Sequence, residues 1–400
     1  MLDLGDLSLC SIQACVLLGT VSRSEGDGAA ESVYYSAASR IANLLDLTNQ
    51  PAANAIDREI NIRGKIGHFR GEIDIIDTNT VWWTLCKIDT WSSAGVGLPR
   101  QMVHKDKVPL PIDEARFLQG LQNSDFEQQL ANNATQPSAL VAQMIILNSI
   151  LIEINDYHTA TVARREPVTI PNQTVLYLSQ KLDDWYSSLP SYMHDTSDNL
   201  QRYGDLGLGR IFVAVYLGYY HFGQLLFYQY LHEDCQTSLA HNQADTESIH
   251  SYAERCKSYS SSLCAIVYAS HRTPKCDVLY TMVGHNLVIS STIQIHTLMF
   301  SDSELSIRQA RMYLEQNFEI LVRLRNFWPV LEVSFEAFRK FREACRRSMV
   351  TAFRMDEWML RFLYGFANKV QDKEMYEAAT AAVWPVVNIG FSPRDWIGTS

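Results

Sequence analysis

Hydrophobic residues recur at three- and four-residue steps along most of the chain, and the strict alternation typical of strands is nearly absent. The first stripe consists of Ile12, Cys15, Val16 and Gly19. The second consists of Tyr34, Ala37, Ala38, Ile41, Leu44 and Leu45. Because residues 22–29 between the stripes are mostly polar, the pattern predicts a helical hairpin that carries Arg40 close to its core.

Further helices are predicted along the rest of the chain by the same periodicity. They cover residues 78–92, 138–164, 174–188, 210–232, 246–270, 277–300, 304–327, 330–349, 351–369 and 373–384. Pro190 ends the helix predicted over residues 174–188, and Pro329 in Trp328-Pro329 separates two later helices. Residues 194–209 are predicted to be a loop. The expected fold is all-α, with roughly a dozen helices in one large or two closely packed bundle cores.

The most specific segment of the chain begins with the adjacent tryptophans Trp82 and Trp83. Neighbours on a helix point about 100° apart, so the pair faces two sides of its helix at once. Asp89 follows Trp82 by seven positions on the same face, where a buried carboxylate needs a partner. Beyond this helix, which breaks at Gly95 and Gly97, an extended strap is predicted from Pro99, Pro109 and Pro111.

Residues 211–231 contain no Asp, Glu, Lys or Arg and are rich in tyrosine and phenylalanine. Their length approaches the ~20 residues that span a bilayer, but tyrosine hydroxyls along the whole segment would lack partners in lipid. A central buried helix of a protein outside the membrane is therefore predicted. Tyr216, Tyr220 and His221 on this helix are candidates to line an apolar pocket for a small-molecule effector, because bundle cores are common ligand sites.

Composition narrows the function further. The chain is 47% hydrophobic with a net charge of −10, so it has a sizeable core and no general attraction for nucleic acid. No direct DNA contact is expected. The acidic N-terminal segment is unlike a signal peptide, and eight cysteines without a Cys-x-x-Cys pair predict reduced thiols inside the cell.

The strongest local positive charge lies in residues 338–347. Its candidate interaction face consists of Arg339, Lys340, Arg346 and Arg347. One interpretation is a solvated amphipathic face, and the other is contact with a DNA backbone, an acidic activation segment or an importin.

The Trp-Trp helix with its aspartate, followed by Gly-Leu-Pro and the Pro-Leu-Pro strap, resembles the regulatory domain of fungal zinc-cluster transcription factors. This domain is called the middle homology region, or fungal-specific transcription factor domain. Other elements similar to the family follow in the same order, at Gln13-Ala14, Ala38–Ala42 around Arg40, Trp185 to Pro190, Tyr220-His221 and Trp328-Pro329. The resemblance covers about residues 10–345. It implies a family domain over residues 1–350 that begins inside the complete region, and a helical extension over residues 351–400.

The family's DNA-binding zinc cluster needs six cysteines in two Cys-x2-Cys-x6-Cys halves, and this chain has no such pattern. No cofactor is therefore expected in this chain, and zinc would be expected only if an N-terminal zinc cluster preceded it. Glu247-x-x-His250 occurs once, whereas a di-iron bundle site needs two such motifs. Asn155-Asp156-x-x-Thr159 is similar to the second metal-binding motif of terpene synthases. That motif requires a glutamate four residues after the threonine, and Ala163 occupies this position here.

The resemblance implies a non-enzymatic transcriptional regulator in a fungus, located in the nucleus and shared in part with the cytoplasm. Expected partners are other transcription factors or coregulators, in homo- or heterodimers, together with a small-molecule effector. The regulated process would be a metabolic or secondary-metabolite gene cluster. Two alternatives stay open: an all-α enzyme acting on an apolar or prenyl substrate, and an inhibitory or relic paralogue that sequesters a full-length factor.

Overall fold

The computed structural model describes residues 7–47, 71–96, 99–102, 108–111, 114, 139–164, 172–236, 243–366 and 368–383. In these ranges the chain forms helices and no strand, which confirms the predicted all-α fold. The helices of the first half are α1 (Leu9–Glu25), α2 (Gly28–Leu44), α3 (Gly71–Val96), α6 (Leu140–Arg164), α7 (Gln173–Ser188), η1 (Ser191–Met193) and α8 (Ser197–Asp205). Those of the second half are α9 (Gly209–Phe227), α10 (Gln229–Gln236), α11 (Gln243–Arg272), α12 (Thr281–Phe300), α13 (Glu304–Arg325), α14 (Leu331–Arg347), η3 (Thr351–Phe353), α15 (Glu357–Tyr364) and α16 (Lys373–Val383).

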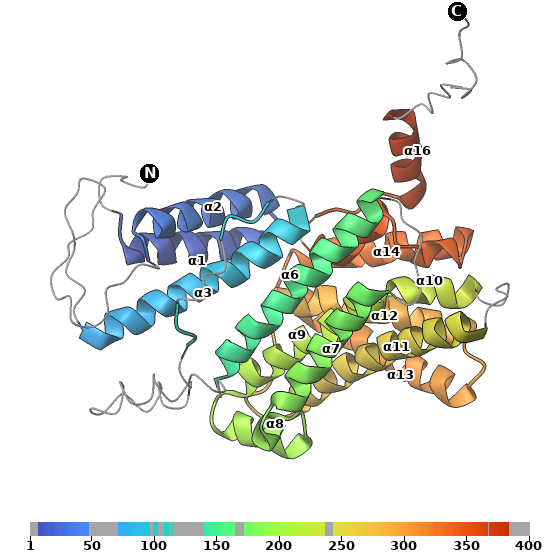
Figure 1. Ribbon diagram of the computed structural model, residues 1–400, viewed down its shortest axis with the longest axis horizontal. Coiled ribbons are helices and arrows are strands. Elements are labelled where there is room, and N and C mark those ends of the chain that lie inside the picture. Colours follow the sequence, from blue (N-terminus) through green and yellow to red (C-terminus); the bar gives the residue numbers. More distant parts are fainter. Residues whose placement is uncertain are drawn as a thin grey trace, which may run out of the picture.

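The helices form a small N-terminal layer beside a larger bundle (Figure 1). The predicted hairpin is present, because α1 and α2 pack along each other and α3 packs against both. Helix α6 contacts α3 on one side and α9 on the other, so it joins the layer to the bundle. In the bundle, α9 packs on α11, and α12 packs between α11, α13 and α14. Helix α16 projects from this body, and its first turns are held to α14 and α15, for example by the hydrogen bond from the Tyr376 hydroxyl to Glu357 (2.7 Å).

Buried hydrophobic side chains form two clusters, which correspond to the layer and the bundle. The smaller cluster joins α1, α2, α3 and the strap, and its members include Ile12, Cys15, Ala38, Ile41, Trp82, Trp83, Leu85, Met102 and Val108. The larger cluster is built around α9 and extends to α15. On α6, Ile145 belongs to the smaller cluster and Leu147 to the larger one, so the two cores meet at this helix.

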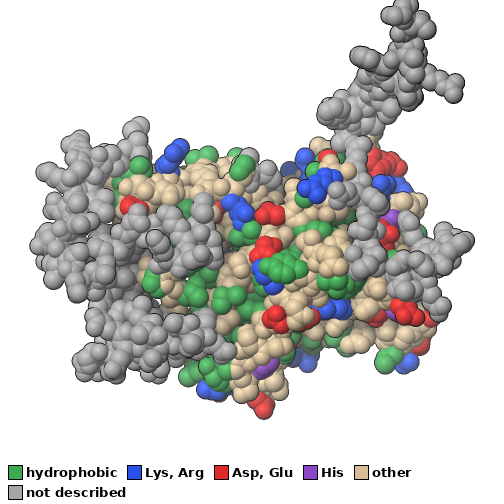
Figure 2. Space-filling view, viewed as in Figure 1, with side chains coloured by type: hydrophobic (Ala, Val, Ile, Leu, Met, Phe, Trp, Pro, Cys, Tyr) green, Lys and Arg blue, Asp and Glu red, His purple; other side chains and the backbone are tan. Residues whose placement is uncertain are grey.

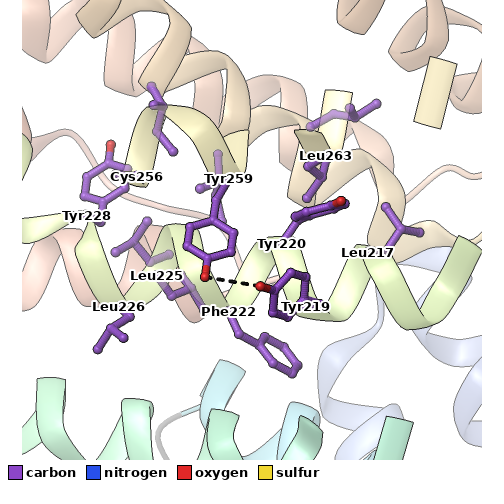
Figure 3. Close-up of a cluster of buried hydrophobic side chains, with 14 of the residues drawn as sticks. Leu217, Tyr219, Tyr220, Phe222, Leu225, Leu226, Tyr228, Cys256, Tyr259 and Leu263 are labelled. Carbon is purple, nitrogen blue, oxygen red and sulfur yellow. Dashed lines mark hydrogen bonds between the residues drawn. The ribbon is translucent and has the colours of Figure 1, made fainter. Parts of the chain in front are cut away.

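Helix α9 is buried on nearly every side, as its composition predicts. Figure 3 shows side chains of α9 interleaved with Cys256, Tyr259 and Leu263 of α11, and the hydroxyls of Tyr219 and Tyr259 lie 3.5 Å apart. Helix α6 has a length and an apolar composition that would suffice for crossing a membrane, and half of its most apolar window is buried in the protein. Its contacts with both cores are those of a core helix.

Several boundaries differ from the predicted ones. Residues 194–209, predicted as a loop, contain α8, because Thr196 caps the helix by accepting a hydrogen bond from the Asn199 amide (3.2 Å). The aromatic helix is divided into α9 and α10 at Tyr228, and the Trp-Trp helix begins at Gly71 instead of residue 78.

The C-terminal region was predicted as one helix over residues 351–369 but forms the short helices η3 and α15. Asp356 interrupts it, because its carboxylate caps α15 by accepting a hydrogen bond from the Met359 amide (2.8 Å). Trp358 and Phe362 of α15 pack into the larger core. The predicted domain boundary at residue 350 stays a prediction.

Candidate functional site

The Trp-Trp motif fastens α3 to the strap. Trp82 and Trp83 are both buried, at 1% and 3% exposure, within the smaller core. The indole N–H of Trp83 donates to the carbonyl oxygen of Pro109 (2.9 Å). Pro99 and Pro109 themselves are exposed, and Pro111 is half-buried. Gly97 lies outside the described residues.

Asp89 is buried and has the partners that its position requires. One carboxylate oxygen accepts hydrogen bonds from the backbone amides of Gln101 and Met102, both at 2.8 Å, and the other accepts from the Ser93 hydroxyl (3.2 Å). Burial raises the pKa of Asp89, while these hydrogen bonds and the charge of Arg100 oppose the increase. The carboxylate therefore holds the start of the strap against α3.

Replacing Asp89 with alanine should lower the free energy of unfolding by about 2 kcal/mol, because the Met102 amide is left buried without its acceptor. Urea denaturation measures the change. The variant Asp89→Asn, which keeps one acceptor oxygen, should show a smaller decrease in the free energy of unfolding. Equal stability of Asp89→Ala and the unmodified chain would show that the carboxylate does not fix the strap.

Between the two cores lies a cavity of about 540 Å³, a size typical of small-molecule sites. Its walls come from α1, α2, α3, α6, α9 and α12, so the cavity lies at the junction of the N-terminal layer and the bundle. Most of the lining is apolar, contributed by residues such as Ile88, Trp91, Met144, Leu147, Ile211, Val215, Phe222 and Met282. Gly218 of α9 also lines it, and a Cβ atom at this position would be in ordinary van der Waals contact with the ring of Phe222.

A few polar side chains interrupt this apolar wall. Lys87 of α3 faces the cavity, and no ion pair or hydrogen bond joins its ammonium to another of the described residues. It keeps some accessible surface because it borders the cavity, but it lies deep in the protein and this burial lowers its pKa. Asn286 of α12 is 4% exposed, and its carbonyl oxygen has no hydrogen-bond partner within the described ranges.

The second cation at the cavity, Arg23, is neutralised in place. Its guanidinium forms an ion pair with the buried carboxylate of Glu31, with the Nε–Oε1 distance at 2.7 Å. The guanidinium also lies over the ring of Tyr35, 5.6 Å from the ring centroid. Asn148, another polar lining residue, accepts a hydrogen bond from the Trp91 indole (3.2 Å). Lys87 is thus the lining cation without a carboxylate beside it among the described residues.

Tyr216, Tyr220 and His221, the predicted pocket residues, line neither this cavity nor the second one described below. Tyr216 and Tyr220 lie on the opposite side of α9, where their hydroxyls donate to the Met193 carbonyl and to the Asp195 carboxylate. His221 stacks on Trp91, with ring centroids 5.9 Å apart. An effector pocket beside the aromatic helix α9 remains a proposal, and the residues of α9 that line the cavity are not the predicted ones.

The other motif residues hold helices together. The indole of Trp185 donates to the Gln143 side chain (2.8 Å), and the indole of Trp328 donates to the Leu279 carbonyl (2.6 Å). Trp185 and Pro190 also line a second cavity, of about 430 Å³, between α6 and α7. Arg40, predicted close to the core, is exposed, because it lies on the outer side of the hairpin.

The candidate basic face on α14 is balanced by acidic residues. Each of its four cations pairs with a carboxylate, at Arg339–Glu336 (2.5 Å), Lys340–Asp372 (2.8 Å), Arg346–Glu343 (3.6 Å) and Arg347–Glu374 (3.0 Å). Figure 2 likewise shows Lys and Arg mixed with Asp and Glu on the face in view. Such pairing weakens the attraction of this face for a polyanion. In the described part of the chain, no three His, Cys, Asp or Glu side chains are grouped to hold a metal ion.

Sequence reasoning did not identify Lys87 or Asn286. A signal for Lys87 exists, since it is the sole charged residue in Val81–Ile88 and follows the buried tryptophans by about one turn. Asn286 carries no comparable signal, because α12 contains several other polar residues that are buried as well.

The model of the fungal-specific transcription factor domain family matches residues 1–208, more than half of the 400-residue chain. The chain belongs to this family. The matched range includes the Trp pair, the strap and Trp185 to Pro190, whereas Tyr220-His221 and Trp328-Pro329 lie beyond it. No curated protein and no solved structure matches the chain.

Membership in the fungal-specific transcription factor domain family gives the chain a general role in transcription regulation, with the nuclear location that this role implies. The family is one of transcription factor domains and not of enzymes. The four helices α1, α2, α3 and α6 that line the cavity from the N-terminal side all lie inside the matched range.

Proposed function

We propose that the chain is the effector and interaction domain of a nuclear transcriptional regulator that contacts other transcription factors or coregulators. The observation that carries the proposal is the cavity between the two cores, whose N-terminal side is lined by helices of the matched family range. A molecule bound there touches both the N-terminal layer and the bundle, so it can change how the two pack and which surface a partner meets. The net charge of −10 and the paired cations of α14 favour protein contacts over direct DNA contact.

The regulated process is proposed to be a metabolic or secondary-metabolite gene cluster, since a cavity of this size suits a metabolite. Deleting the coding sequence and comparing transcripts of the deletion and parent strains tests this part. Coordinated changes confined to one cluster support it, and an unchanged transcriptome contradicts it.

Fused to an unrelated DNA-binding domain, the chain should change transcription of a reporter that carries the matching binding site. The change is expected because the proposed contacts with coregulators would act at the reporter. Either an increase or a decrease in reporter transcription supports the proposal. The reporter is measured against the DNA-binding domain alone, at equal nuclear protein level. A fusion indistinguishable from the DNA-binding domain would contradict regulation through protein contacts.

A further inference from the structure

We propose that the cavity between the two cores binds an organic anion with an apolar body, whose carboxylate or similar group pairs with the Lys87 ammonium. The inference rests on the proposed function only in that it concerns the same effector cavity, and it names the class of ligand. The apolar body would contact the walls formed by α6 and α9, and a hydrogen-bond donor on the ligand would reach the Asn286 side chain.

The first argument is the position of Lys87. An ammonium group taken out of water is costly unless a carboxylate or several acceptors compensate it. No such partner is found among the described residues, although the side chain lines the cavity together with Trp91 and apolar residues of α6. A ligand carboxylate would supply the missing partner in a charge-assisted hydrogen bond.

The second argument is the charge of the neighbouring groups. Glu31, a buried acid on the hairpin, is held by Arg23, and Asp89 on α3 accepts hydrogen bonds from the backbone amides of Gln101 and Met102. Neither carboxylate is left to neutralise Lys87. The cavity therefore presents an excess positive charge inside an acidic protein, which selects against cationic ligands.

The third argument is Asn286, whose buried carbonyl oxygen lacks a donor among the described residues. A buried acceptor without a hydrogen bond is destabilising, and a ligand hydroxyl, amide or amine can satisfy it. Asn286 comes from α12 and Lys87 from α3, so the two polar groups enter the cavity from different cores. Two fixed polar groups within an apolar wall are the pattern that orients a small ligand.

Three probes with the same tail and different head groups test the proposal: decanoate, decanamide and decylamine. Their binding to the purified full chain is measured by isothermal titration calorimetry at neutral pH. Decanoate should bind most tightly and decylamine least. Lys87→Met, which keeps the length of the side chain, should weaken decanoate binding by at least about tenfold and leave decanamide binding unchanged.

Two further variants separate charge recognition from loss of folding. Lys369→Met removes an exposed lysine that does not line the cavity, and it should bind all three probes as the unmodified chain does. Gly218→Leu places a side chain into the cavity and should weaken the binding of all three probes to the same extent. The proposal is overturned if the three head groups bind equally, if none binds, or if Lys87→Met keeps the preference for decanoate.

The binding test and the reporter test fail independently. A fusion that regulates the reporter but shows no preference for decanoate would refute the ligand class and leave the proposed function in place. Selective decanoate binding with a silent reporter would refute regulation through protein contacts and leave the anion site in place.

Discussion

Acidification from about pH 7.5 to about pH 5.5 should lower the free energy of unfolding by about 5 kcal/mol. The cause is a set of four histidines buried in the neutral form, at positions 158, 221, 285 and 296. Burial lowers the pKa of three of them, His158, His285 and His296, to about 4, and it lowers the pKa of His221 well below its usual value.

The sign follows from proton uptake. In the unfolded chain each of these histidines binds a proton as the pH falls through about 6.5. In the folded chain the pKa of His158, His285 and His296 is about 4, and the pKa of His221 is well below its usual value, so all four stay neutral at about pH 5.5. Their stabilising contribution is complete above pH 6.5 and is lost as the pH falls toward 4. Each contributes about 1.3 kcal/mol of the loss between pH 7.5 and 5.5. The raised pKa of Asp89 has the opposite effect on the free energy of unfolding, but it comes from one residue and the loss comes from four histidines.

Two of the histidines determine where the structure should open first. The Nε2–H of His285 donates to the carbonyl oxygen of Leu363 (2.9 Å), and the Nδ1 of His158 lies 2.9 Å from the hydroxyl of Tyr364. Both contacts hold α15 against the bundle. Acid-induced opening should therefore begin at α15, which hydrogen exchange with mass spectrometry can locate.

Urea denaturation at the two pH values measures the total effect. The double variant His158→Gln/His285→Gln should reduce the pH-dependent loss roughly by half, since glutamine does not titrate. His250→Gln, which changes an exposed histidine beside Asp234, is the matched control and should leave the loss unchanged. Equal unfolding free energies at pH 7.5 and 5.5 would mean that these four histidines are not held neutral by the fold.

The sequence predicted the helices whose boundaries are marked by strong local signals. Pro190 follows the end of α7, and Trp328-Pro329 separates α13 from α14, because proline removes a backbone donor and blocks the helix. Helix α8 was missed because it is short and polar, and one capping threonine decides its start. Periodicity gives the buried face of each helix but not which helices share it, so it does not determine the number of cores.

The predicted pocket residues lie on helix α9, and the cavity in the structure borders other residues of the same helix. Helix α9 is buried almost all round, so its composition has no polar side that could indicate which residues meet a cavity. Their hydroxyls favour Tyr216 and Tyr220 as pocket residues, but in the structure these hydroxyls donate hydrogen bonds to Met193 and Asp195. A cavity between cores depends on how layers pack, and such packing leaves little trace in one sequence.

Replacing Trp82 with alanine should destabilise the N-terminal core by about 4 kcal/mol. The side chain is 1% exposed and lies among the buried residues of α1, α2 and the strap. Removing the indole takes a large buried apolar area from a small core, and the hairpin has few other large side chains that could fill the space. The Trp83 indole, which keeps its hydrogen bond to Pro109, should not compensate, because it faces a different side of α3.

Because the protein has two cores, hydrogen exchange can show whether the destabilisation caused by Trp82→Ala is confined to the N-terminal layer. Hydrogen exchange of the Trp82→Ala variant should speed up in α1 and α2 and stay slow in α9 and α12, since their side chains belong to the other cluster. Trp358→Ala, at an equally buried tryptophan of the larger core, should produce the reverse pattern. Because the cavity borders both cores, each variant should also weaken decanoate binding, but only the first should do so without loosening the bundle. Uniformly faster exchange in Trp82→Ala would show instead that the layer and the bundle unfold as one unit.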